Sequence, residues 1–183
     1  MSNLAPIVFV VAILICGCAK ADDIGAEKED KIVKLVMNMK LTSPAFGHNS
    51  KIPHEYTCDG DDISPELNIE DVPSNAKSLV LINDDPDAPV GTWDHWIVFN
   101  VKPDIKKINE NEEPIGVAGK NSWGRTGYGG PCPPSGTHRY FFKIYALDTE
   151  LNLQEGSTKQ EIEKAMGGHI IEKAELIGLY ERE

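Results

Sequence analysis

The stretch THRYFFKIYAL at residues 137–147 decides the fold, because it is the longest part of the chain with strand character. Its aromatic and β-branched residues favour an extended backbone that packs in a sheet. Shorter stretches of the same kind lie at residues 78–83, 95–101 and 174–180. Glycine and proline often interrupt the chain between them, which is typical of turns. We therefore predict a mainly β domain, an antiparallel sandwich with few helices.

Alternation along each strand also predicts which residues share a face. In the long strand, His138 and Tyr140 are expected on one face and Arg139 on the other. In the strand at residues 95–101, one face is expected to hold His95, Ile97, Phe99 and Val101.

One helix is predicted near the C-terminus. Thr158 and Glu161 have the spacing of a capping box, in which each side chain bonds the backbone N–H of the other residue. A short apolar stripe follows, and Gly167 and Gly168 are expected to end the helix.

Length and charge narrow the class of protein. The chain has 183 residues, which is about one domain. Its formal net charge is −11, and no cluster of Lys and Arg supplies the basic surface that a nucleic-acid partner requires. We therefore expect no nucleic acid as a partner, and the acidity favours solubility.

The N-terminal segment is predicted to lie outside the fold. Residues 5–17 are apolar but fall short of the roughly 20 residues that a membrane-spanning helix needs. They fit the apolar region of a secretory signal peptide, although no Lys or Arg precedes them. We predict a signal peptide at residues 1–17, a flexible linker at 18–34 and a domain at 35–183.

Two cleavage sites compete at the end of this segment. Ile-Cys-Gly-Cys at residues 15–18 resembles a bacterial lipobox and predicts lipidation of Cys18, which makes a membrane-anchored lipoprotein. Cleavage after Ala-Lys-Ala at residues 19–21 would instead release a periplasmic or extracellular protein. An uncleaved anchor is a third alternative. Either cleavage predicts an exported protein.

The remaining cysteines fit export. Under either cleavage only Cys58 and Cys132 are left to pair, and an oxidising compartment permits a disulfide. The alternative is two separate buried thiols.

Three segments carry candidate functional residues. Asp-Asp-Pro-Asp-Ala-Pro at residues 84–89 ends a strand, because its prolines remove backbone donors. Asp-His-Trp at residues 94–96 opens the next strand, where a nearby carboxylate would favour the imidazolium form of His95. A Gly/Pro loop at residues 127–136 leads into the long strand, and its N–H groups are suited to an anion nest. The alternatives are an acidic turn, a core histidine and an ordinary tight loop.

Taken in order, these segments resemble the two signatures of the phosphatidylethanolamine-binding family. Asp-Pro-Asp-Ala-Pro at residues 85–89 with His-Trp-Ile-Val at residues 95–98 resembles the first. Gly-Pro-x-Pro-Pro-x-Gly-x-His-Arg-Tyr at residues 130–140 resembles the second. The segments at residues 57–65 and 145–148 are similar to the bacterial Raf-kinase-inhibitor-like (YbhB/YbcL) branch of the family.

The resemblance implies a sandwich of two antiparallel β-sheets with a few short helices and a ligand cavity. Members of the family hold phosphate-like anions there, including phosphoethanolamine head groups. It therefore implies non-enzymatic binding of a small anion or zwitterion, or of a phospholipid head group, with no cofactor and no catalytic residue. The ligand-binding residues that it implies are Asp85, Asp87, His95, Gly130, Pro131, His138 and Tyr140.

Other functions remain open. One alternative is a protein-interaction module or an inhibitor that presents the cavity to an unknown partner. A hydrolase is disfavoured because no Gly-x-Ser-x-Gly elbow occurs, and because Ser135 and His138 would point to opposite faces of a strand. Asp85, His95 and His138 are the types of a two-His-one-carboxylate metal site, but the chain lacks His-Glu-x-x-His and Cys-x-x-Cys spacings.

Overall fold

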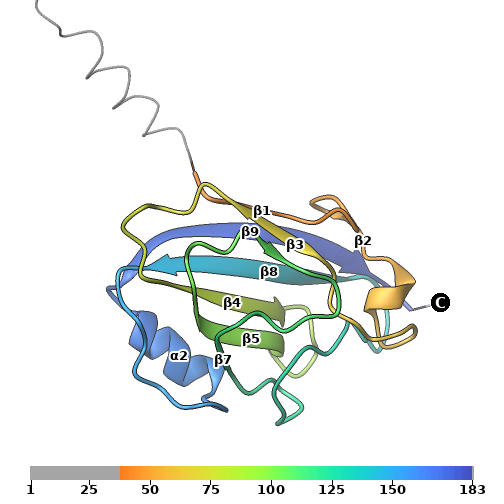
Figure 1. The fold of residues 1–183 in the computed structure, drawn as a ribbon. Coiled ribbons are helices and arrows are strands. Elements are labelled where there is room, and N and C mark those ends of the chain that lie inside the picture. The colour runs from red at the N-terminus through yellow and green to blue at the C-terminus, as the bar shows by residue number, and fades with distance from the viewer. Residues whose placement is uncertain (1–37, 183) are drawn as a thin grey trace, which may run out of the picture. The chain divides into compact units, whose positions relative to one another are not determined.

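The fold is a sandwich of a small and a large β-sheet (Figure 1). A computed structural model describes residues 38–182, so the predicted signal peptide, the lipobox with Cys18 and the predicted linker lie outside the described residues. The small sheet has the strand order β1 (Lys40–Thr42), β3 (Leu67–Glu70), β6 (Lys107–Ile108). The large sheet has the order β2 (Ser50–Lys51), β9 (Ile170–Tyr180), β8 (His138–Leu147), β4 (Ser78–Asp85), β5 (Trp93–Val101), β7 (Val117–Ala118). The prediction of a mainly β, two-sheet architecture is confirmed.

Pairing within the sheets is antiparallel with one exception. The two-residue strand β2 runs parallel to β9, at the edge of the large sheet. The long strand β8 lies between β9 and β4 and pairs with both along most of its length. The segment with the strongest strand character therefore lies inside the large sheet.

Each face of the large sheet buries its own apolar cluster. One cluster lies between the sheets and joins Leu41, Leu67 and Ile69 of the small sheet to Leu81 and Phe142 of the large one. The other lies on the opposite face and is covered by α2 (Lys159–Met166). A short helix η1 (His54–Tyr56) is the other helical element described.

The helix α2 begins as predicted. The Thr158 side chain accepts from the Glu161 N–H, and the Glu161 carboxylate accepts from the Thr158 N–H at 2.8 Å. Ile162 and Met166 are buried against the sheet, and Gly167 follows the last turn. Among residues 38–182, no helix has both the length and the apolar character to cross a membrane.

Two irregularities in β5 change the predicted faces. Asn83 pairs with Trp96 but Asp84 pairs with Asp94, so His95 is an extra residue in the ladder. A second shift lies near Asn100, which has a φ of 55°. Such bulges turn side chains to the other face of a strand.

The prediction that four residues of β5 share one face is therefore wrong. Ile97 and Phe99 pack in the cluster under α2. Val101 packs between the sheets, and the ring of His95 lies 5.2 Å from that of Tyr140, which belongs to the same cluster. The first bulge thus turns His95 away from α2.

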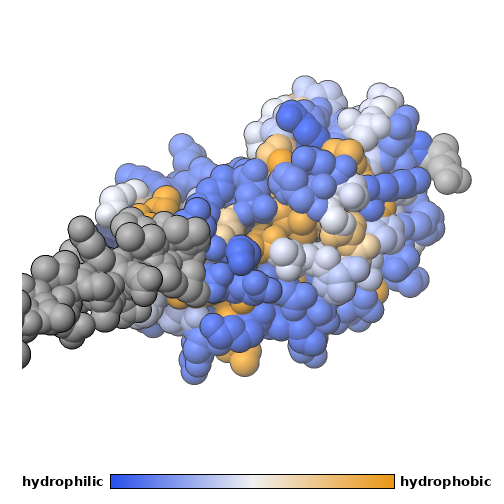
Figure 2. Space-filling view, turned by 90° about the horizontal axis from the view of Figure 1, so that it is seen from above, coloured by the Kyte–Doolittle hydropathy of each residue, from blue (hydrophilic) through white to orange (hydrophobic). Residues whose placement is uncertain are grey.

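The surface is mostly hydrophilic on the face seen in Figure 2, with apolar side chains gathered near its middle. A groove of about 640 Å³ lies between β1 and β9, which belong to different sheets, and its lining includes Met39, Leu41, Phe46 and Leu176. These side chains are buried and belong to the cluster between the sheets, so the groove marks an edge where the core approaches the surface.

Candidate anion-binding site

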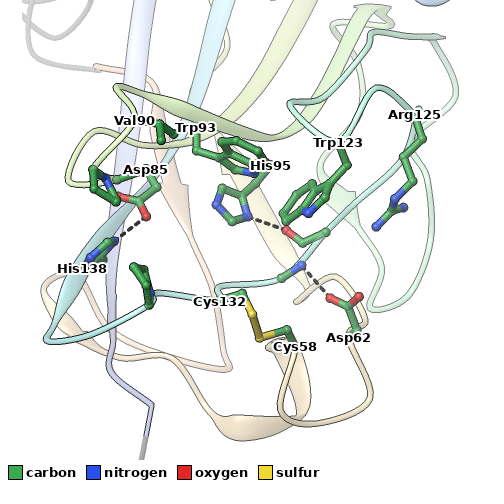
Figure 3. A pocket seen from close by; sticks show the side chains of 15 residues that line it. Cys58, Asp62, Asp85, Val90, Trp93, His95, Trp123, Arg125, Cys132 and His138 are labelled. Atoms are coloured by element: carbon green, nitrogen blue, oxygen red, sulfur yellow. Dashed lines mark hydrogen bonds and ion pairs between the residues drawn. A yellow bond between two sulfur atoms is a disulfide. The ribbon is translucent and has the colours of Figure 1, made fainter.

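A cavity of about 370 Å³ opens at one end of the large sheet, where β4 ends and where β5 and β8 begin. Its polar side chains are Asp62, Asp85, His95, Arg125 and His138. Its apolar wall contains Ala88, Pro89, Val90, Trp93, Trp123 and Pro134 (Figure 3). This volume suits a small ligand that is bound mostly by side chains.

A carboxylate and a histidine form a close pair in this cavity. The Asp85 Oδ2 atom lies 2.7 Å from Nδ1 of His138, and both residues are buried, with 3% and 7% of their surface exposed. The other oxygen, Oδ1, accepts from the Asp87 N–H at 2.8 Å. Asp85 therefore fixes the orientation of the His138 ring and leaves Nε2 as the ring nitrogen without this partner.

Asp87 does not line the cavity. Its carboxylate accepts two hydrogen bonds from the guanidinium of Arg139, at 2.7 and 2.9 Å, and one from the Arg139 N–H at 3.0 Å. These bonds lower the pKa of Asp87 to about 2. The residue thus ties the loop after β4 to the start of β8, on the side of β8 opposite His138 and Tyr140, as alternation predicts for Arg139.

His95 is held by a backbone carbonyl instead of a carboxylate. Its Nδ1 atom lies 2.7 Å from the Gly129 carbonyl oxygen, and the residue is only 2% exposed. Burial lowers the pKa of His95 below its usual value, which favours the neutral ring. The expectation that a nearby carboxylate makes His95 an imidazolium is therefore wrong, because burial outweighs the opposite effect of the Asp85 carboxylate on this pKa.

In the neutral form, His95 has one defined tautomer. The Gly129 carbonyl oxygen only accepts, so Nδ1 carries the hydrogen and donates it. Nε2 then has a free lone pair. His95 is thus an acceptor in the cavity wall.

The Gly/Pro loop closes another wall. The Gly130 N–H donates to Asp62 Oδ1 at 2.6 Å, so this amide is already used and does not form the predicted nest. A Cβ atom at Gly130 would lie 2.5 Å from the Tyr56 carbonyl oxygen, so only glycine fits there. Pro131 is buried and is not part of the lining; its carbonyl accepts from the Cys58 N–H at 3.1 Å.

Tyr140 packs in the core against His95 of the cavity wall. Its ring is fully buried and meets the His95 ring edge to face at 5.2 Å. Burial, with the Asp85 carboxylate nearby, raises the pKa of Tyr140 well above its usual value. Tyr140 therefore packs beneath His95 and is not part of the lining.

Cys58 and Cys132 lie in the wall and form a disulfide in the structure. Their Sγ atoms are 2.08 Å apart and their Cα atoms 5.4 Å apart. The pair is thus placed for a bridge between two loops of the cavity.

Sequence reasoning missed the residues at the mouth. Trp93, Trp123 and Arg125 come from segments that carry no family signature, and the resemblance of residues 57–65 to the family does not single out Asp62. The rings of Trp123 and Trp93 meet at 5.5 Å, and that of Trp123 lies 5.0 Å from His95. A sequence signal exists for this loop, since Asn121 and the glycines at 124 and 127 are typical of a tight turn.

Within residues 38–182, no three side chains of His, Cys, Asp or Glu lie close enough together to hold a metal ion.

A two-sheet β-sandwich with this polar cavity defines a ligand-binding protein of the phosphatidylethanolamine-binding type. The chain belongs to the phosphatidylethanolamine-binding protein family, whose model matches residues 42–181. The family predicted from the two signatures is thereby confirmed.

Relatives come from archaea and bacteria. A UPF0098 protein of Pyrococcus horikoshii is 48% identical over 192 residues, covering 100% of this chain and 91% of the relative. The crystal structure of a phosphatidylethanolamine-binding protein homolog from Chlamydia trachomatis has a TM-score of 0.78 and 48% identity, over 80% of this chain and 99% of that one. E. coli YbcL, described as a member of the mammalian family, has a TM-score of 0.75 and 29% identity over the same shares.

Proposed function

We propose that the domain binds a small phosphate-bearing anion or zwitterion in this cavity and does not convert it chemically. The convergence of His95, Asp85 and His138 on one cavity carries the proposal. In the imidazolium form, His138 donates from Nε2 to a phosphate oxygen while Nδ1 donates to Asp85. The neutral His95 accepts from the hydroxyl of a phosphate monoanion or from an ammonium group.

The residues of the lining support binding over catalysis. Among residues 38–182, no serine, threonine or lysine lines the cavity, and the two cysteines of the lining are joined in a disulfide. Thr137 and Ser135, the two hydroxyl residues just before His138 in sequence, are exposed and do not belong to the lining. A hydrolase would need an activated nucleophile beside its base.

The test is a titration with phosphoethanolamine and with inorganic phosphate, followed by calorimetry and by amide chemical shifts. We expect shifts at Asp85, His95 and His138. We expect His138→Ala to weaken binding about tenfold or more, because it removes a charge-assisted donor. His169→Ala is the matched control, since His169 also pairs with an aspartate, Asp148, at 2.8 Å but lies exposed outside the cavity.

The outcomes separate clearly. Unchanged affinity in the folded His138→Ala variant would refute the assignment of this histidine. No binding by the native protein would refute the anion proposal itself and would favour a protein partner. The exposed Val90 and Trp123 at the rim, 77% and 44% exposed, would then be the first residues to substitute in a search for that interface.

We further propose that the protein is exported and held at a membrane by lipid on Cys18. The lipobox at residues 15–18 and the cysteine pair in the cavity wall support this proposal. Mass spectrometry of the protein from its own cells is the test. A mature N-terminus at Asp22 without lipid would show the rival cleavage and a released protein.

A further inference from the structure

The mouth of the cavity carries two opposite charges apart from the Asp85–His138 pair. In Figure 3, Asp85 and His138 lie at one side, Arg125 and Asp62 at the other, and His95 between them. The proposed anion site uses only the first group. The second group is unexplained by it.

Arg125 is held in place by its own loop. The Asn121 Oδ1 atom accepts from the N–H groups of Trp123 and Arg125 at 3.1 and 3.3 Å, and Nδ2 donates to the Gly127 carbonyl at 3.0 Å. The guanidinium donates from one nitrogen to the Tyr128 carbonyl at 3.1 Å and lies 5.7 Å from the Trp123 ring centre. Its position is thus set before a ligand arrives.

The charge of Arg125 is not neutralised by a neighbour. Within residues 38–182, no carboxylate lies within ion-pair distance of it, whereas Arg139 and Arg182 each have an aspartate partner. The Nε and the second terminal nitrogen of Arg125 can therefore donate hydrogen bonds to a ligand, and a carboxylate is the acceptor that this pair of donors fits.

Asp62 supplies the opposite charge. Its Oδ1 atom accepts from the Gly130 N–H at 2.6 Å, and no cation lies within ion-pair distance of it in the described part of the chain. Its second oxygen accepts no hydrogen bond from residues 38–182. An ammonium group is the ligand group that this oxygen favours.

From these positions we propose that the ligand is a phosphorylated amino acid of the O-phosphoserine type, with its phosphate beside His95 and His138, its carboxylate on Arg125 and its ammonium on Asp62. The assignment rests on the proposed function and adds the distal groups of the ligand. Phosphoethanolamine lacks the carboxylate and leaves Arg125 unused. A phosphoserine inside a peptide chain has amides in place of both charges, so the site selects the free amino acid or a head group that keeps both charges.

Four probes test the assignment by calorimetry on the purified full chain. They are O-phosphoserine, phosphoethanolamine without the carboxylate, 3-phosphooxypropanoate without the ammonium, and glycerophosphoserine as the lipid head group. We expect O-phosphoserine to bind about fivefold more tightly than phosphoethanolamine, because Arg125 is exposed and pairs of exposed charges are weak. Glycerophosphoserine equal to O-phosphoserine assigns the lipid source, and weaker binding assigns the free amino acid.

Two substitutions connect this preference to the mouth. Arg125→Gln is expected to abolish the advantage of O-phosphoserine over phosphoethanolamine, and Lys120→Gln, which removes the same charge from the same loop outside the lining, is expected to keep it. Asp62→Asn keeps an oxygen for the Gly130 N–H and is expected to abolish the advantage of O-phosphoserine over 3-phosphooxypropanoate.

The failures are distinguishable. Equal affinity of the native protein for O-phosphoserine and phosphoethanolamine overturns this inference and leaves the anion site standing. An advantage that survives in a folded Arg125→Gln variant also overturns it. Absence of binding by every probe overturns the anion site as well.

Discussion

Replacing Cys58 and Cys132 together by serine removes a covalent link between two loops that are 74 residues apart in sequence. In the chain-entropy treatment, a bridge over a separation of 74 residues stabilises the folded state by about 4 kcal/mol, because it restricts the unfolded chain. For a domain near 150 residues this corresponds to a fall in Tm of roughly 10 °C. The folded loops should keep their local geometry, since the Cys58 N–H still donates to the Pro131 carbonyl.

The assay is thermal and denaturant unfolding of the double-serine variant against native protein whose bridge has been verified by mass spectrometry. Ser135→Ala, an exposed change in the same Gly/Pro loop, is the control and should leave Tm unchanged. A loss of stability below about 1 kcal/mol would refute the entropic reasoning for this bridge. Two free thiols in protein taken from its own compartment would remove its premise.

Two further predictions concern buried charge. Because burial lowers the pKa of His95, the unfolded chain binds a proton at His95 at a higher pH than the folded chain does. The contribution of neutral His95 to stability should therefore be complete above about pH 6.5 and be lost as the pH falls through the lower folded pKa. His95→Gln should flatten this part of a curve of Tm against pH, and an unchanged curve would refute the assignment. Asp84 is 1% exposed and is bonded by both Lys143 and Lys159. Lys143→Met or Lys159→Met alone should therefore lower stability only mildly. The double variant should lose about 3–5 kcal/mol of unfolding free energy in denaturant, because the buried Asp84 carboxylate then has no cationic partner among these lysines. If the loss in the double variant were simply the sum of the two single losses, the prediction would be contradicted.

Much of the large sheet was predictable from the sequence, and the small sheet was not. The strands at residues 137–147 and 78–83 have enough aliphatic or aromatic residues to be recognised by composition alone. The strands of the small sheet have only two to four residues, which is too short for a periodic pattern. They are strands because the apolar face of the large sheet offers them a surface to pack on.

The candidate site likewise contains residues that the sequence predicted and residues that it did not. The signatures predicted Asp85, His95 and His138, and the structure brings them together in one cavity. The sequence did not predict that Asp85 pairs with His138 and not with His95. This pairing depends on the bulge that turns His95 and on the position of the start of β8 beside the end of β4. Arg125 was missed since an isolated arginine in a glycine-rich loop has no pattern; its place at the mouth follows from how that loop folds around Asn121.

The proposed anion site is compatible with an acidic protein because the carboxylates around the cavity do not act alike. Strand alternation places Asp84 and Asp85 on opposite faces of the sheet. Asp84 therefore pairs with Lys143 of β8 and Lys159 of α2, while Asp85 faces the cavity. Asp87 is neutralised by Arg139 and Asp85 pairs with His138. The three carboxylates at the end of β4 and in the loop after it thus each have a cationic or histidine partner, and the repulsion that a phosphate would meet from them is largely offset. What distinguishes one anion from another is then left to Arg125 and Asp62, the charges at the mouth that have no ion-pair partner among residues 38–182. We therefore expect the choice of ligand to respond more to substitution at the mouth than to substitution of Asp84, Asp85 or Asp87.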